Sequence, residues 1–132
     1  MEYDKLLFVL LASVLVLIIS KGPAWLQARK ACGQRLSALA GVLPDGARLD
    51  GRYLLYFWSP SCGMCRNTTT IINALMESRQ DVISLNVLEH MELAQEVGIM
   101  GTPAFMLVDQ QKVERLVLGS RSRKQLLEML TP

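Results

Sequence analysis

The sequence is poor in cysteine and histidine and has no block of like charge. It holds three cysteines and one histidine in 132 residues, with a formal net charge of +2. Three cysteines are too few for a disulfide framework, and two of them, Cys62 and Cys65, form a C-x-x-C pair that fits redox chemistry. The basic residues are scattered instead of forming one stripe, which argues against nucleic acid as the main partner. Repeats and low-complexity segments are also absent.

The N-terminus is strongly apolar. Residues 6–20 carry no charge and lie between two lysines. As a helix this stretch is about 22 Å long, short against about 30 Å of hydrocarbon, but the lysines can snorkel and Trp25 can lie at the interface. A membrane anchor over residues 1–26 is therefore predicted. A cleaved signal peptide, with its one passable site at residues 22–24, and an ordinary buried helix are the alternatives.

The rest of the chain divides into a juxtamembrane connector and a compact domain. Residues 27–47 form the predicted connector, with a short helix over 34–40, and residues 48–132 form the domain. Turn residues and apolar periodicity predict a βαβαββα order. Strands are expected over 52–58, 81–88, 104–108 and 113–118, and helices from Cys62, over 89–97, and after a serine cap at Ser120 or Ser122.

Cys62 and Cys65 fall at the predicted start of the first helix of the domain. Unpaired backbone N–H groups and the positive end of the helix dipole stabilise a thiolate at such a position. The spacing puts both sulfurs on one helical face, where they can form a disulfide. The predicted reaction is attack of the Cys62 thiolate on a substrate disulfide, followed by attack of Cys65 on the mixed disulfide. In reverse, the same pair oxidises dithiols.

Three motifs resemble the thioredoxin family over roughly residues 49–130: FWSPSCGMCR at residues 57–66, GIMGTP at residues 98–103, and Gly119 after the last strand pair. The resemblance implies an α/β thioredoxin-like fold with a central mixed sheet, preceded here by a transmembrane helix. The first strand and helix of a full thioredoxin would be missing or rebuilt from residues 33–50. The implied activity is that of a thiol-disulfide oxidoreductase without a cofactor, which reduces protein disulfides.

The resemblance also implies a substrate-binding surface around the cysteine pair. Pro103 matches a proline that is cis in the family, lies beside the cysteines and pairs with extended substrates through its loop. Thr102 and Gly119 are expected to take part in the same surface. Trp58 is expected either to shield the site or to be a plain core residue.

Two departures from the family pattern leave the direction of electron flow open. The family's buried acid falls at Tyr56 and its lysine partner falls at Ser84, so Cys65 is expected to be activated more slowly or through water. The dipeptide between the cysteines is Gly63-Met64 instead of Gly-Pro. A dithiol oxidase or isomerase that uses the same pair therefore remains an alternative.

The stretch LPDGARLDGRYLLYFWSP at residues 43–60 also resembles the entry to the membrane-tethered periplasmic thioredoxin-like reductases of bacteria. It implies protein disulfide or dithiol substrates, an upstream electron donor such as a membrane thiol reductase, and an inner-membrane anchor with a periplasmic domain. Flanking charge indicates the cytoplasmic face instead, because one basic residue precedes the span and four follow it, namely Lys21, Arg29, Lys30 and Arg35. We predict the periplasmic face, with the cytoplasmic face as the alternative.

Two other classes of function compete with the redox interpretation. Cys62, Cys65, Cys32 and His90 could together supply ligands for copper or zinc in a metal chaperone, although no metal is predicted. The domain could also be a redox-silent docking module. Cys32 is most simply an unpaired thiol of the connector, with an intermolecular disulfide as the alternative.

Overall fold

A four-stranded mixed sheet forms the centre of the domain, in the order β2-β1-β3-β4. The computed structural model covers residues 1–132 and describes every side chain except those of residues 21–25, 27 and 28. The strands are β1 (Arg52–Trp58), β2 (Val82–Asn86), β3 (Ala104–Asp109) and β4 (Lys112–Leu118). β1 is parallel to β2 and antiparallel to β3, and β3 is antiparallel to β4. The predicted mixed sheet is confirmed.

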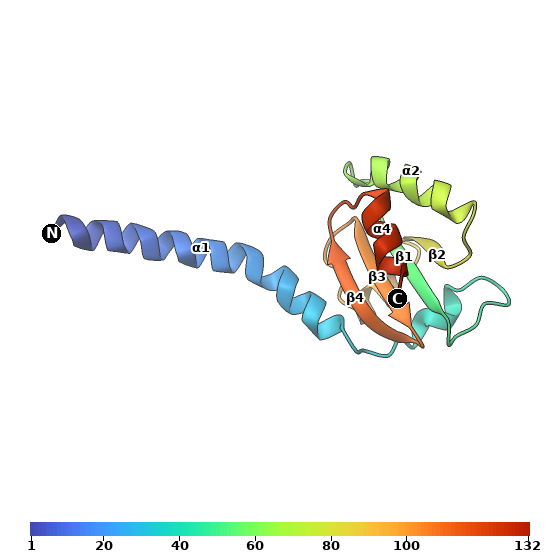
Figure 1. Cartoon of the computed structure of the whole chain (residues 1–132). Coiled ribbons are helices and arrows are strands. Elements are labelled where there is room, and N and C mark those ends of the chain that lie inside the picture. The colour runs from blue at the N-terminus through green and yellow to red at the C-terminus, as the bar shows by residue number, and fades with distance from the viewer.

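The helices follow the predicted order, with shifted boundaries. They are α1 (Glu2–Ala31), the 3-10 helix η1 (Ala38–Gly41), α2 (Cys65–Met76), α3 (Met91–Glu96) and α4 (Arg123–Leu130). From β1 onward the order is βαβαββα (Figure 1). The short helix predicted over 34–40 is wrong in extent, since only η1 is helical there. The cap of α4 is Ser122, which forms a capping box with Gln125.

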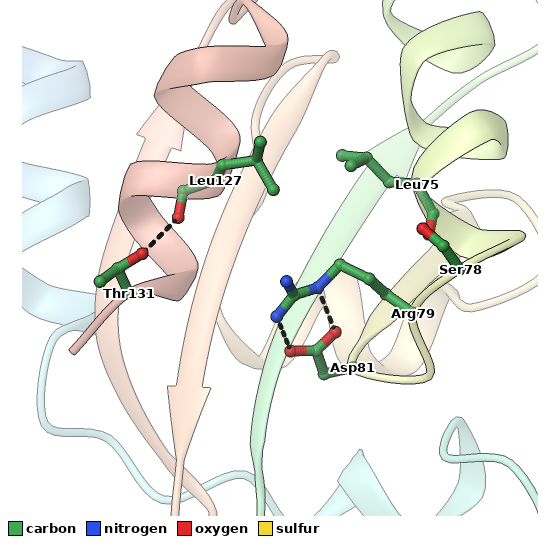
Figure 2. Close-up of polar contacts among 6 residues, drawn as sticks. All are labelled: Leu75, Ser78, Arg79, Asp81, Leu127 and Thr131. Carbon is green, nitrogen blue, oxygen red and sulfur yellow. Dashed lines mark hydrogen bonds and ion pairs between the residues drawn. The ribbon is translucent and has the colours of Figure 1, made fainter.

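Both faces of the sheet are covered, which explains the continuous apolar run of β1. α2 and α4 cover one face, and Leu54 and Tyr56 point toward them. α3, η1 and the end of α1 cover the other face, where Tyr53, Leu55 and Phe57 are buried. In Figure 2, Leu75 of α2 and Leu127 of α4 project toward each other over their shared face.

The ends of α2 and α4 are fixed by local polar contacts (Figure 2). The Ser78 hydroxyl donates to the carbonyl oxygen of Leu75, and the Thr131 hydroxyl donates to that of Leu127. Arg79 forms a two-pronged ion pair with Asp81, with N–O distances of 2.8 and 2.6 Å. Its hydrogen bonds hold the pKa of the Asp81 carboxyl below the ordinary value. These contacts fix the chain as it enters β2 and as it leaves α4.

The candidate membrane span lies at the start of α1. Residues Glu2–Ser20 are long and apolar enough to cross a membrane by length and composition, a test that a signal sequence also passes. Figure 1 shows this part of α1 extending away from the domain, and none of it is buried. Lys21 and Trp25, expected at the membrane interface, belong to the side chains that the structure does not describe.

The segment after α1 runs along the edge of the sheet. The Gly33 N–H donates to Val113 O at 2.7 Å, the Val113 N–H donates to Gln34 O at 3.0 Å, and the Leu36 N–H donates to Gln111 O at 2.9 Å. Leu36 and Leu39 are 2% and 0% exposed and belong to the core below the sheet. Residues 31–43, within the predicted connector, therefore contribute buried side chains to the domain.

Glu96 holds this segment against α3. Its carboxylate accepts hydrogen bonds from the Ser37 N–H and the Ser37 hydroxyl, both at 2.8 Å, and from the Ala38 N–H at 3.2 Å. Burial would raise the pKa of Glu96, but these hydrogen bonds outweigh burial and hold the pKa below its ordinary value. A carboxylate thus caps the N-terminus of η1.

Candidate active site

β1 places the cysteine pair at one end of the sheet. After Trp58 the chain turns, with the Cys62 N–H donating to Ser59 O at 3.1 Å, and enters α2 at Cys65. Cys62 and Cys65 form a disulfide with a Cα–Cα distance of 5.3 Å. Cys62 is half-buried, whereas Cys65 is 2% exposed. A partner can therefore approach the sulfur of Cys62 but not that of Cys65.

The Cys62 sulfur lies at the N-terminal end of α2. The backbone N–H of Cys65 donates a hydrogen bond to it at 3.1 Å. α2 begins at Cys65, three residues later than predicted, so Cys62 lies just ahead of the helix instead of inside it. An N–H group aimed at a sulfur at the positive end of a helix stabilises the thiolate that forms when the disulfide is reduced.

The loop before β3 lies beside the cysteine turn. The Thr102–Pro103 peptide bond is cis. The hydroxyls of Ser59 and Thr102 are 3.4 Å apart, which joins the two loops. Gly119, with φ +88°, donates its N–H to Pro103 O at 2.8 Å. The structure thus places Thr102, Pro103 and Gly119 close together beside the cysteine turn.

Trp58 contacts both the core and the hollow at the cysteine pair. It is half-buried and packs against the core between the sheet and the α2 and α4 helices. It also lines a hollow of about 310 Å³ that contains both cysteines. The indole is therefore part of the core and part of the wall of the site.

Tyr56 lies beneath the cysteines in the place of an acid. Its side chain is fully buried and stacks on Phe105 with ring centroids 5.2 Å apart. The hydroxyl donates to Cys65 O at 3.3 Å and lies 2.9 Å from the Thr69 hydroxyl. Burial raises the pKa of the Tyr56 phenol, and the hydrogen bond with Thr69 opposes this only in part. Ser84 is the direct cross-strand partner of Tyr56, so neither charge of the family's buried pair is present.

Two kinds of residue at the site were not found from sequence. Thr69 lines the hollow beside Cys65, and its spacing of one helical turn after Cys65 was the signal that could have identified it. Met91 and Met100 line a mostly apolar hollow of about 230 Å³ on the other side of Ser59 and Thr102. They come from α3 and from the loop before Pro103, and no sequence motif connects them.

The cysteines and histidine of the metal alternative lie apart. The Cys32 thiol is exposed and donates to Glu114 O at 3.0 Å, near the start of β4 and away from the cysteine pair. His90 precedes α3. Among the described residues, no three His, Cys, Asp or Glu side chains are grouped so that they could hold a metal ion. The structure therefore does not bring the four candidate ligands together.

The comparison with known proteins identifies the family. The model of the family described as Thioredoxin matches residues 47–132. The thioredoxin of Pseudomonas aeruginosa is 28% identical over 89 residues, which cover 65% of this chain and 82% of that protein. The NADPH-dependent thioredoxin reductase 3 of Arabidopsis thaliana is 31% identical over 80 residues, which cover 58% of this chain but only 15% of that protein.

Solved structures support the same fold. The thioredoxin of Malassezia sympodialis superposes with a TM-score of 0.54 at 24% identity, covering 62% of this chain and 74% of that one. A mutant thioredoxin of Halobacterium salinarum gives a TM-score of 0.56 at 23% identity, with coverage of 61% and 73%. The fold predicted from the motifs is confirmed. The chain belongs to the thioredoxin family, and with its Cys62–Cys65 disulfide it is a thiol-disulfide oxidoreductase of the thioredoxin type.

Proposed function

We propose that the protein reduces disulfides of protein substrates at a membrane surface, with Cys62 as the attacking thiolate and Cys65 as the resolving thiol. One observation carries the assignment of roles. Cys62 is accessible and its sulfur receives the Cys65 N–H, whereas Cys65 is buried at 2% exposure. Only the accessible Cys62 sulfur can reach a disulfide of another protein. Burial keeps the Cys65 sulfur from reacting with that disulfide in place of Cys62.

The reaction transfers two electrons from the dithiol to the substrate. The Cys62 thiolate attacks one substrate sulfur, a Cys62–substrate disulfide forms, and the other substrate sulfur leaves as a thiolate. Cys65 then loses its proton and attacks Cys62, which closes the Cys62–Cys65 disulfide and releases the second substrate thiolate. An upstream dithiol donor, for which a membrane thiol reductase is our candidate, must restore the reduced pair.

The cis-proline loop is proposed to hold the substrate chain during this exchange. Thr102 and Pro103 lie next to the cysteine turn, and Gly119 fixes the Pro103 carbonyl from the end of β4. Extended chains bind in this way when their main chain pairs with an exposed backbone edge. Trp58 is proposed to close the other wall of the hollow and keep water from the reacting sulfurs.

The anchor is proposed to place this activity at a bacterial inner membrane, with the domain on the periplasmic side. α1 supplies a span of sufficient length in Glu2–Ser20. Its continuation to Ala31 and the pairing of residues 33–36 with the edge of β4 connect the span to the domain without a free linker. We propose an anchor over residues 1–26 and a catalytic domain over residues 48–132. Residues 31–43 join the two and add buried side chains to the core of the domain.

Trapping of the mixed disulfide tests the roles of the two cysteines. The full chain in detergent micelles, pre-reduced and carrying Cys65→Ser, should attack a disulfide-bonded peptide, release one half of it as a thiol and retain the other half in a stable disulfide with Cys62, visible by mass spectrometry. Cys32→Ser serves as the matched control, because Cys32 lies far from the pair and should leave the reaction intact. Stable trapping through Cys65 in the Cys62→Ser variant, with none through Cys62, would reverse the roles.

A measurement of the reduction potential separates the reductase from the oxidase. The potential of the Cys62–Cys65 couple should lie near that of thioredoxin, about −270 mV. A value near −120 mV would instead support a dithiol oxidase. The Cys32→Ser background removes the third thiol from the titration.

A further inference from the structure

A third hollow lies next to the one that contains the cysteine pair. It measures about 530 Å³ and lies between the first turns of α2 and the loop that joins β4 to α4. Its lining residues are Gly63, Met64, Arg66, Asn67, Thr68, Ile71, Ser120 and Arg121. Gly63 and Arg66 also line the hollow that contains Cys62 and Cys65. The two hollows are therefore neighbours, with Gly63 and Arg66 between them.

This third hollow, called the arginine groove below, carries positive charge that no carboxylate among the described residues pairs with. Arg66 and Arg121 are its only charged lining residues, and neither forms an ion pair with a described residue. The arginines at the opposite end of the sheet differ, since Arg48, Arg52 and Arg79 each pair with a carboxylate. The Arg121 guanidinium donates one hydrogen bond to a described residue, from Nη1 to Ser120 O at 2.8 Å. Most of its five N–H donors remain available.

The two arginines come from different elements and flank the same opening. Arg66 follows Cys65 on α2, and Arg121 lies in the loop two residues after Gly119, which bonds to Pro103. A chain held by the cis-proline loop with a cysteine at Cys62 would therefore pass their guanidinium groups. Guanidinium groups bind carboxylates with paired, charge-assisted hydrogen bonds.

We propose that this groove binds carboxylate side chains next to the substrate disulfide, so that the protein prefers acidic polypeptide segments. The inference rests on the proposed disulfide reductase function and adds a substrate class to it. Each exposed guanidinium–carboxylate pair is expected to raise the rate of exchange about threefold at low ionic strength, and the gain falls with added salt.

The test compares peptides that differ only beside the cysteine. Pre-reduced full chain in neutral detergent micelles is mixed with disulfide peptides that carry Glu, Gln or Lys at the flanking positions, and the second-order rate of Cys62–Cys65 oxidation is measured. The Glu peptide should react about tenfold faster than the Gln peptide at low salt, since two pairs contribute about threefold each, and the Lys peptide should react more slowly still. Equal rates for the Glu and Gln peptides would overturn the proposal.

Variants locate the effect. Arg66→Gln and Arg121→Gln should each lower the ratio of Glu to Gln peptide rates about threefold. The ratio cancels any change in the reactivity of Cys62 itself. Lys112→Gln is the matched control, since it removes one exposed positive charge at the far end of β4 and should leave the ratio unchanged. A ratio that survives the double arginine variant, or that falls equally in the Lys112 variant, would overturn the proposal.

Two further arms identify the source of the carboxylate. Glutathione disulfide should react more slowly than the Glu peptide, and a faster reaction would assign the groove to small disulfides instead of polypeptides. Phosphatidylglycerol added to the micelles should leave the Glu preference intact, and its loss would assign the groove to lipid headgroups. Failure of all disulfide peptides to oxidise the reduced pair would refute the proposed function itself, a result distinct from loss of the charge preference.

Discussion

Replacing Tyr56 by aspartate would restore an acid beneath the cysteines and change both stability and chemistry. Tyr56 is fully buried and its ring stacks on Phe105. Loss of a buried aromatic ring costs about 3 to 5 kcal/mol. An unpaired buried carboxyl costs more still, because Ser84 stands across the strand where a lysine would supply the opposite charge. A typical domain has an unfolding free energy of about 5 to 15 kcal/mol, so Tyr56→Asp should keep only a small part of the stability of the wild-type fold.

The loss should depend on pH in a defined direction. Burial raises the pKa of the Tyr56 phenol, and the same burial should raise the pKa of a carboxyl at this position. The folded variant then holds a proton that the unfolded chain releases above about pH 3.9. Its stability is therefore fully present below that value and declines as the pH rises toward the folded-state pKa. The free-energy gap to wild type should widen between pH 5 and pH 7.

The chemical effect has the opposite sign. The ionised fraction of a carboxyl near Cys65 can take the thiol proton as Cys65 attacks the mixed disulfide. General-base assistance of this kind speeds a step by about 100-fold at the lower end of its usual range, so resolution should accelerate as the pH rises toward the folded-state pKa of the carboxyl. Stopped-flow measurement of substrate release, after mixing reduced protein with a disulfide peptide, reports this step. Urea titrations of the same samples report stability.

Two variants control the experiment. Tyr56→Phe keeps the ring but removes the hydroxyl that contacts Cys65 O and Thr69, so it should cost about 1 kcal/mol and leave resolution unaccelerated. Adding Ser84→Lys to Tyr56→Asp gives the carboxylate a partner and should recover stability at pH 7. A folded Tyr56→Asp protein with wild-type resolution kinetics would refute the reasoning, because the position would then have no influence on the proton of Cys65.

The segment before β1 provides two further tests by urea unfolding. Glu96→Gln should lower the free energy of unfolding by about 1 to 3 kcal/mol at pH 7, since it weakens the hydrogen bonds to Ser37 and Ala38. Folding lowers the pKa of Glu96, so the stability that its carboxylate contributes is present above the unfolded-state pKa and is lost as the pH falls through the folded-state pKa. The difference in stability between variant and wild type should therefore disappear in acid. A chain that starts at residue 48 should be much less stable than one that starts at residue 31, because it lacks Leu36 and Leu39, each worth about 2 to 5 kcal/mol; equal midpoints would show that residues 31–43 do not support the fold.

Local patterns predicted the elements that build the site. The seven-residue run at residues 52–58 is β1 at the predicted bounds, because a short aromatic and aliphatic run between turn residues is typical of a strand buried on both faces. The serine before α4 was ambiguous in sequence, and the reciprocal bonds of Ser122 and Gln125 decide the cap. Local chemistry was sufficient here, since each signal and its partner lie within a few residues.

Features that depend on distant partners were not predictable. The helix expected over residues 34–40 was wrong because the backbone there pairs with β4, some eighty residues away in the chain, and Glu96 caps what remains. The Tyr56 contact with Thr69, and the presence of Arg66 and Arg121 along one hollow, also depend on which elements the fold brings together. The cysteine pair was predictable because its motif lies within one turn.

The face of the membrane on which the domain lies is the last expectation, and two arguments conflict. Flanking charge favours the cytoplasm. However, the backbone of Arg35 pairs with that of Lys112 in an isolated antiparallel β-bridge at the sheet edge, so at least one of the four basic residues after the span belongs to the folded domain instead of a free flank. We therefore expect the periplasmic face, in line with the family resemblance.

Cys32 offers a direct readout of this face. It is an exposed free thiol just after α1, on the same side as the domain. In a Cys62→Ser, Cys65→Ser variant it is the only thiol, so a membrane-impermeant maleimide should label it in intact spheroplasts without prior reduction. Wild type treated with a reductant should also gain label at Cys62. Labelling only after lysis would place the domain in the cytoplasm, and a shortened protein released into the soluble periplasmic fraction would show that the apolar segment is a cleaved signal peptide instead of an anchor.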